Sequence, residues 1–150
     1  MPVGAESANV GSMNRRDFQQ LSRLRIREAK VLLDAGLFCG SYYLAGYSVE
    51  CALKAIIARR TRRYDFPDKA LANQIHTHNL THLLQAAQLT TALEHAMAVA
   101  PPLQENWRSV LLWGEGTRYI LETSELNASE LYLACTSRRD GVLPWLKNFW

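Results

Sequence analysis

The chain has little cysteine, and the spacing of the few residues it has excludes several classes of protein. Three Cys occur among 150 residues, at positions 39, 51 and 135, and no pair forms a Cys-x-x-Cys motif. We interpret them as buried, reduced thiols of a cytoplasmic protein rather than as a disulfide framework or a zinc site. The first 13 residues also lack the apolar run of a signal peptide. We expect residues 1–13 to be a disordered tail and residues 14–150 to form one folded domain.

A long uncharged apolar run is absent as well. The most apolar stretch, residues 38–57, still contains Glu50 and Lys54. Two central charges would be costly in lipid, so this stretch does not predict a membrane span. It is apolar around the whole helical wheel, which is typical of a buried helix. We therefore expect a central helix at 38–57 in an all-α, up-and-down helical bundle of about five helices.

No strand pattern, internal repeat or low-complexity segment interrupts this helical pattern of the chain. Apolar spacing of three and four residues predicts a first helix over 14–36, which Gly36 ends. Thr77 or Asn79 can cap a short helix that comes after a loop at 64–78. Pro101 and Pro102 end a helix at 91–100, and another helical pattern begins after them. Asn127-x-x-Glu130 has the form of a capping box that opens the last helix.

Several catalytic signatures are missing. Residues 114–117 predict a turn, but Gly114 and Gly116 lack the spacing and the preceding strand of a phosphate-binding loop. His78 and His82 share one helical face, but no HExxH motif or third ligand accompanies them. Acidic residues are scattered, so no carboxylate pair for hydrolysis stands out. The sequence predicts neither a metal site nor a cofactor.

A polar seam runs along the central helix. Tyr43, Tyr47, Glu50 and Lys54 recur at helical spacing on one stripe, and the acid precedes the base by four residues. Buried charges are costly unless they are paired. The seam is therefore either a structural ion pair of the core or the lining of a binding cleft, and both interpretations stay open.

Positive charge is concentrated near the end of the same helix. Four Arg occur within residues 59–63, and the chain has a formal net charge of +3. Cations compensate the exposed carbonyls of a helix C-terminus. Arg also binds phosphate groups in a bidentate way. Dipole compensation and contact with an anion or nucleic acid are the two alternatives here. For the Arg-rich face of the helix expected at 14–36, the two alternatives are solvation by water and contact with RNA.

Three short motifs together resemble the HEPN family (higher eukaryotes and prokaryotes nucleotide-binding). They are residues 49–54 (VECALK), residues 78–80 (HNL) and the pair Arg118–Tyr119. The resemblance spans about residues 15–147. It implies a helical bundle that commonly dimerises. Many members are metal-independent ribonucleases, often toxins, and others are encoded with a small nucleotidyltransferase as toxin–antitoxin pairs.

The chain departs from the catalytic members of that family, which carry Arg, then four to six residues, then His. None of the four His has an Arg at that distance, and Arg108 is followed five residues later by Trp113. We therefore predict a non-catalytic module that binds nucleotide, RNA or a partner protein. It would act as a homodimer or with a nucleotidyltransferase-like protein. Besides the resemblance, two features predict the dimer: the small residues of the central helix, and the apolar C-terminus at 143–150, which must either pack back on the bundle or cover a partner. The alternatives are a divergent ribonuclease toxin and a structural dimeric scaffold.

No catalytic residue is predicted. The candidate nucleotide- or RNA-binding residues are Arg62 of the basic cluster and a set of polar residues that we expect to be embedded in apolar helices and that would form a site where they converge: Tyr43, Glu50, Lys54, His78, Arg118 and Tyr119.

Overall fold

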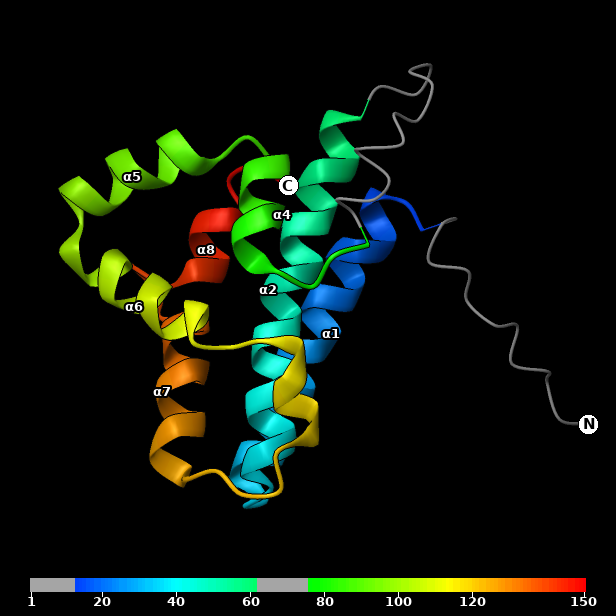
Figure 1. Ribbon diagram of the computed structural model, residues 1–150, viewed down its shortest axis with the longest axis vertical. Coiled ribbons are helices and arrows are strands. Elements are labelled where there is room, and N and C mark those ends of the chain that lie inside the picture. The colour runs from blue at the N-terminus through cyan, green and yellow to red at the C-terminus, as the bar shows by residue number, and fades with distance from the viewer. Residues whose placement is uncertain (1–12, 62–75) are drawn as a thin grey trace, which may run out of the picture.

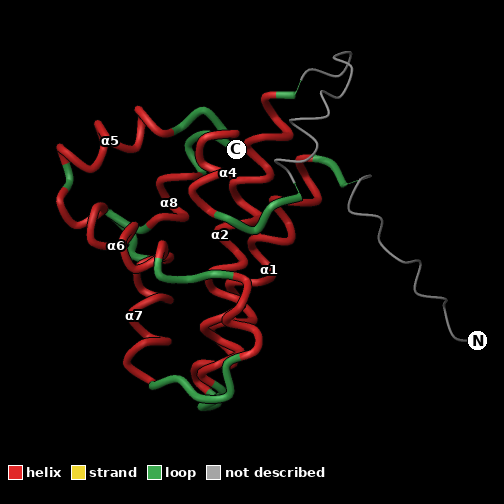
Figure 2. Tube along the Cα trace, viewed as in Figure 1, coloured by secondary structure: helices red, strands yellow, loops and turns green. Residues whose placement is uncertain are grey.

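The structure is a computed structural model that describes residues 13–61 and 76–150. These described residues form seven α-helices and one 3₁₀ helix and contain no strand (Figures 1 and 2). In chain order the elements are α1 (Arg15–Asp34), α2 (Phe38–Arg60), α4 (Leu80–Ala86), α5 (Thr90–Val99), α6 (Pro101–Leu111), η2 (Glu115–Tyr119), α7 (Glu125–Thr136) and α8 (Val142–Leu146). The prediction of an all-α helical bundle is confirmed. The expected number of about five helices is too low.

Helices α1 and α2 form an antiparallel hairpin that organises the chain. Asn14 caps α1 in a capping box with Asp17, and Gly36 at φ 78° makes the turn into α2. Two buried hydroxyls then join the helices. Ser22 Oγ donates to the Ser48 carbonyl oxygen at 2.8 Å, and Ser41 Oγ donates to the Ala29 carbonyl oxygen at 2.7 Å. Small polar residues therefore let the two backbones pack closely without leaving polar atoms unpaired.

Helix α2 is the core of the molecule. It contacts α1, α4, α7, α8 and η2, so its side chains from Ser48 to Ile57 are buried on every side. Val49, Leu53 and Ile56 are each 0% exposed. The prediction of a buried central helix is confirmed. Figure 1 shows α1, α2 and α7 along the long axis, with α5 and α6 at one side.

The C-terminal segment packs back onto this core. Leu143 and Leu146 are buried, and Arg59 Nη1 at the end of α2 donates to the Phe149 carbonyl oxygen at 3.0 Å. Trp145 and Phe149 pack against each other with ring centroids 4.9 Å apart. The apolar C-terminus is therefore used within the chain rather than left open for a partner.

Three local predictions are wrong. Ser124, not Asn127, caps α7, because its side chain accepts the Asn127 amide at 3.0 Å and leaves Asn127 inside the helix. Residues 115–119 form a 3₁₀ helix, where a simple turn at 114–117 was expected. Cys39 is half-buried rather than buried. The predicted tail at 1–13 falls almost wholly outside the described residues.

Candidate functional site

The site is centred on the carboxylate of Glu50, which is 1% exposed. Lys54 Nζ donates to its Oε2 at 3.1 Å, and His78 Nδ1 lies 2.9 Å from its Oε1. Each carboxylate oxygen thus has its own partner. The Lys54 side chain is 6% exposed, whereas that of His78 is 44% exposed. Glu50 therefore links a buried ammonium group to an imidazole at the surface.

The sequence explains how these three side chains meet. Glu50 and Lys54 are four residues apart on α2, so they share one face. Asn79 caps α4, because its Oδ1 accepts the His82 amide at 3.0 Å. The main-chain N–H of Asn79 in turn donates to Thr77 Oγ1 at 3.1 Å. This capped turn fixes the backbone beside His78 and brings its ring onto the seam of α2. Of the two residues predicted to cap this helix, Thr77 and Asn79, the structure confirms Asn79.

His78 also lines a cavity of about 310 Å³ between the start of α4 and the end of α6. The walls combine polar and apolar groups: Thr77, His78, Asn79, Leu80, Thr81, Leu111, Trp113 and Gly114. A cavity of this size, with apolar walls and a few convergent polar groups, is typical of small-ligand sites. His78 thus connects the polar seam of α2 to this surface cavity.

Trp113 is the functional candidate that the sequence did not single out as a site residue. It is 5% exposed, and its Nε1 donates to the Tyr43 carbonyl oxygen at 3.1 Å. A Cβ added at Gly46 would lie 2.2 Å from the indole ring, so only glycine leaves room for it. Gly46 inside a buried helix was the sequence signal for this close approach. Trp113 is a fixed wall of the cavity.

Two tyrosines continue this aromatic layer along α2. The Tyr43 ring stacks at 6.0 Å from Trp113 and at 5.9 Å from Tyr47. Burial is the main reason that the pKa of Tyr47 is raised well above its ordinary value, and the charge of Glu50 adds to this. Tyr47 is therefore a neutral hydroxyl at neutral pH. The Arg25 guanidinium lies 5.9 Å from the Tyr47 ring centroid and ties α1 to the layer.

The remaining predicted residues do not belong to the buried seam. Arg118 and Tyr119 lie on η2, where the Arg118 guanidinium sits 4.9 Å from the Tyr119 ring centroid. Tyr119 is 73% exposed, so the expectation that this pair is embedded in apolar helices is wrong. The 3₁₀ helix turns both side chains outward. Arg62 lies outside the described residues. The structure thus brings together Glu50, Lys54 and His78, with Tyr43 adjoining through Trp113.

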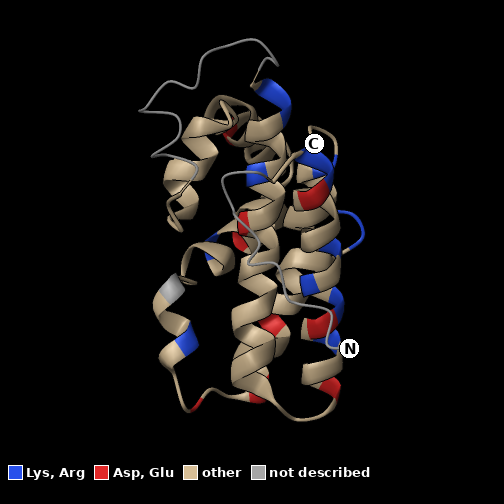
Figure 3. Cartoon of the chain, turned by 90° about the vertical axis from the view of Figure 1, so that its right-hand side faces the viewer, with Lys and Arg blue, Asp and Glu red and all other residues tan. Residues whose placement is uncertain are grey.

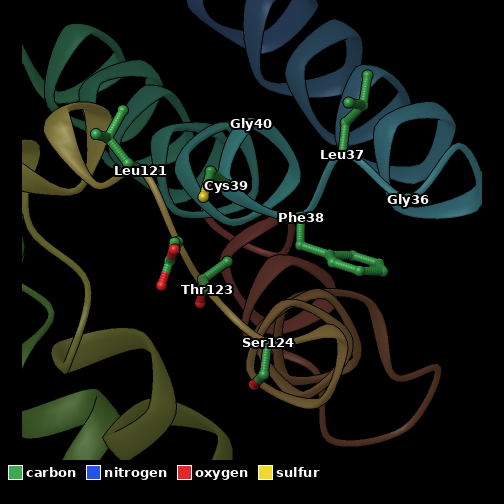
Figure 4. Close-up of a pocket in the computed structure, with 9 residues that line it drawn as sticks. Gly36, Leu37, Phe38, Cys39, Gly40, Leu121, Thr123 and Ser124 are labelled. Carbon is green, nitrogen blue, oxygen red and sulfur yellow. The ribbon is translucent and has the colours of Figure 1, made fainter.

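A second hollow, of about 650 Å³, lies at the far end of the bundle. Figure 4 shows Phe38, Cys39 and Gly40 of α2 facing Leu121, Thr123 and Ser124 of the segment before α7. None of the predicted site residues lines it.

The described ranges, 13–61 and 76–150, also bear on two other classes of site. No group of three or more His, Cys, Asp or Glu in them is placed to hold a metal ion. None of their helices has the length and hydropathy required to cross a bilayer.

Comparison with known proteins gives one partial similarity. The chain is 28% identical over 105 residues to methylthioribose-1-phosphate isomerase from two strains of Leptospira biflexa serovar Patoc. The match covers 68% of this chain but only 29% of the isomerase. The chain therefore spans less than a third of that relative. No protein-family profile matches the chain, and no solved structure matches it significantly.

The geometry defines what the site can do chemically. Because a carboxylate accepts hydrogen bonds, His78 Nδ1–H is the donor in the 2.9 Å contact with Glu50 Oε1, and this contact fixes the orientation of the ring. Its opposite edge then faces away from the carboxylate. Hydrogen-bonding groups next to an apolar wall suit a ligand that has polar groups and a planar, aromatic part.

Proposed function

We propose that this chain is a HEPN-like, non-catalytic module that binds a nucleotide, free or within RNA, in the cavity beside His78. The observation that carries the proposal is the placement of Glu50. Its buried carboxylate is paired on one side with Lys54 and on the other with a half-exposed imidazole that lines the cavity. A purely structural ion pair would need only Lys54. The additional contact orients a surface group, which favours a ligand site.

The cavity fits a nucleotide in chemistry and in size. Asn79 and Thr81 offer hydrogen-bonding side chains, while Leu111, which is 43% exposed, supplies apolar surface for a base. Its volume of about 310 Å³ is at the lower end of the range for small-molecule pockets. A single nucleobase with part of its sugar is therefore the ligand size that it supports.

Trp113 supports the non-catalytic form of the proposal. It stands five residues after Arg108, where a ribonuclease of the family would have its His. An indole cannot exchange a proton near neutral pH, and its N–H is already bound to the Tyr43 carbonyl oxygen. Arg108 itself is exposed and bound to Glu105 at 3.0 Å. This pair of positions therefore supplies neither a general base nor a general acid.

One observation favours the ribonuclease alternative. A carboxylate that holds a half-exposed imidazole is the arrangement that positions a general base in many hydrolases. In that case His78 would deprotonate a 2′-hydroxyl. RNA cleavage in the presence of EDTA, lost in His78→Ala, would establish this function in place of simple binding.

Homodimerisation and pairing with a nucleotidyltransferase-like protein remain part of the proposal. The two sequence arguments for a dimer fail, because the small residues of α2 and the apolar C-terminus are both used inside the chain. Exposed apolar side chains elsewhere support a partner surface. On α1, Val31 is 67% exposed and Leu24 is 40% exposed.

The proposal is tested by calorimetric titration with nucleoside monophosphates. We expect saturable binding to the wild-type chain and at least tenfold weaker binding to His78→Ala. His95→Ala is the matched control, because His95 lies on α5 and does not line this cavity. Absence of binding by the wild type, or equal loss in both variants, would overturn the assignment to this cavity.

A further inference from the structure

A group of cations lies at the end of the molecule where α1 begins and α2 ends. They surround the C-terminal residues. The Arg23 guanidinium sits 4.7 Å from the Trp150 ring centroid, and Lys147 Nζ sits 5.5 Å from the same ring. Arg59 Nη1 donates to the neighbouring Phe149 carbonyl oxygen. Three parts of the chain, α1, α2 and the segment after α8, thus contribute to one surface.

The partners of these cations are uncharged groups. Arg23 and Lys147 rest on an aromatic ring, and Arg59 is held by a peptide carbonyl. Three cations elsewhere in the described part of the chain pair with carboxylates instead: Arg25 with Glu28, Lys30 with Asp34 and Arg108 with Glu105. Among the described residues no acidic side chain is recorded in contact with Arg23, Arg59 or Lys147, and Arg15, whose Nη2 donates to the Trp150 main-chain oxygen at 2.6 Å, adds a fourth cation to the group.

Several acids lie at the opposite end of the bundle, although Asp17 in the first turn of α1 lies at the same end as the cations. Helices α1 and α2 are antiparallel, so Asp34 lies at the opposite end from Arg59. Glu122 lines the hollow at that far end, and Glu125 begins α7 beside it. Figure 3 shows several blue segments and one red segment near the C-terminus, and further red segments along the molecule and at its lower end. Burial, together with the charge of Arg23, lowers the pKa of Lys147, as expected where like charges meet.

We infer that Arg23, Arg59 and Lys147 form a phosphate-binding surface for single-stranded RNA, separate from the His78 cavity. The inference rests on the proposed function in taking RNA as the ligand. Arg59 lies nine residues after Glu50 on α2, about 14 Å along the helix axis. Phosphate contacts position a strand and carry no sequence information. The surface would thus supply affinity, while the cavity would select the nucleotide.

The test measures the salt dependence of binding to a polyuridine strand of about 12 nucleotides by fluorescence anisotropy. Each phosphate contact on a single strand contributes about 0.7 to the slope of log K against log salt. Removing two contacts in Arg23→Gln/Arg59→Gln should lower the slope by about 1.4. A rise from about 50 to 200 mM salt weakens the contribution of these two contacts to wild-type affinity by about sevenfold. The affinity of the variant should therefore fall about sevenfold less than that of the wild type over the same range of salt.

Lys30→Gln/Arg108→Gln is the matched control. It changes the net charge by the same amount but removes two cations that are paired with carboxylates. We expect its salt slope to stay close to that of the wild type. An unchanged slope in Arg23→Gln/Arg59→Gln, an equal drop in both variants, or no RNA binding by the wild type would overturn the inference. Thermal unfolding of both variants shows whether each is folded.

The failure of this inference can be distinguished from failure of the proposed function. If the wild type binds mononucleotides but the Arg variant keeps the full salt slope, the surface is wrong and the cavity stands. If mononucleotides do not bind but the slope falls only in the Arg variant, the cavity is wrong and the surface stands.

Discussion

Removing one charge of the Glu50–Lys54 pair should destabilise the protein far more than removing both. The side chains are 1% and 6% exposed, so neither charge can be solvated by water when its partner is lost. Loss of one member of a buried pair costs about 3–5 kcal/mol in the free energy of unfolding. We expect Glu50→Leu and Lys54→Met to fall in that range each.

The double variant Glu50→Leu/Lys54→Met separates the roles of the pair. Replacing both charges with apolar residues of similar size is often neutral or stabilising. His78 loses its contact with Glu50, but its side chain is 44% exposed, so water replaces the carboxylate. We therefore expect the double variant to lie within about 1.5 kcal/mol of the wild type. It should nevertheless lose nucleotide affinity.

Urea unfolding monitored by far-ultraviolet circular dichroism measures these free energies. Asp34→Ala is the surface control, because the Lys30–Asp34 pair has side chains that are 49% and 62% exposed. Exposed pairs contribute about 1 kcal/mol or less. If the single variants at Glu50 and Lys54 were no worse than Asp34→Ala, the charges would not be buried as described. If the double variant were as unstable as the singles, the pair would be required by the fold itself.

The packing supports three further predictions. Gly46→Ala places a Cβ 2.2 Å from the Trp113 ring and should destabilise the protein by about 1–3 kcal/mol in urea, despite the better helix propensity of Ala; equal or greater stability would show that Trp113 does not pack there. Cys39 is half-buried while Cys51 and Cys135 are buried, so a thiol reagent should label Cys39 first in the folded protein and all three after unfolding; rapid native labelling of Cys51 would contradict the core packing. Burial raises the pKa of both Cys51 and Cys135 from 9.0 to about 12, so the folded state keeps protons that the unfolded state releases. The free energy of unfolding should therefore fall as the pH rises above about 9. In Cys51→Ala/Cys135→Ala the urea midpoint should depend less on pH over that range.

Much of the fold could be predicted from local patterns in the sequence. The charge-poor stretch at 38–57 predicts the buried helix α2, because only the protein interior accommodates a helix that is apolar on all sides. Gly36 and Asn79 mark helix boundaries where the structure has them, since each supplies a local geometry that other residues disfavour. Ser124 was missed as a cap because Asn127–Glu130 offers the same signal three residues later.

The candidate site was only partly predictable. Glu50 and Lys54 are four residues apart, so their pairing is a consequence of helix geometry. His78 is 28 residues from Glu50, and no local rule places it on the carboxylate. The resemblance to the HEPN family suggested that residue. Trp113 packs on Gly46 across a still longer separation, and only a tertiary contact assigns it to the wall of the cavity.

The same limit applies to the exposed residues. Arg118 and Tyr119 come after a segment of apolar helix, so the sequence pattern favoured a position inside the bundle. The 3₁₀ geometry of η2 puts them at the surface instead. The C-terminus differs from its expectation in the opposite direction, because residues that could have covered a partner pack on the bundle. Its aromatic residues suggested a partner surface, but Arg59 and the core retain them within the chain.

Whether the cavity beside Glu50 is a nucleotide site can be read from the side-chain ¹H–¹⁵N NMR spectrum of the histidines during titration with a nucleoside monophosphate. We expect the ring signals of His78 to shift saturably, while those of His95 on α5 stay unchanged. We also expect Glu50→Leu/Lys54→Met to stay folded and to lose the His78 shift. If no His78 signal moves at saturating nucleotide, or if His95 moves equally, the cavity beside Glu50 is not a nucleotide site.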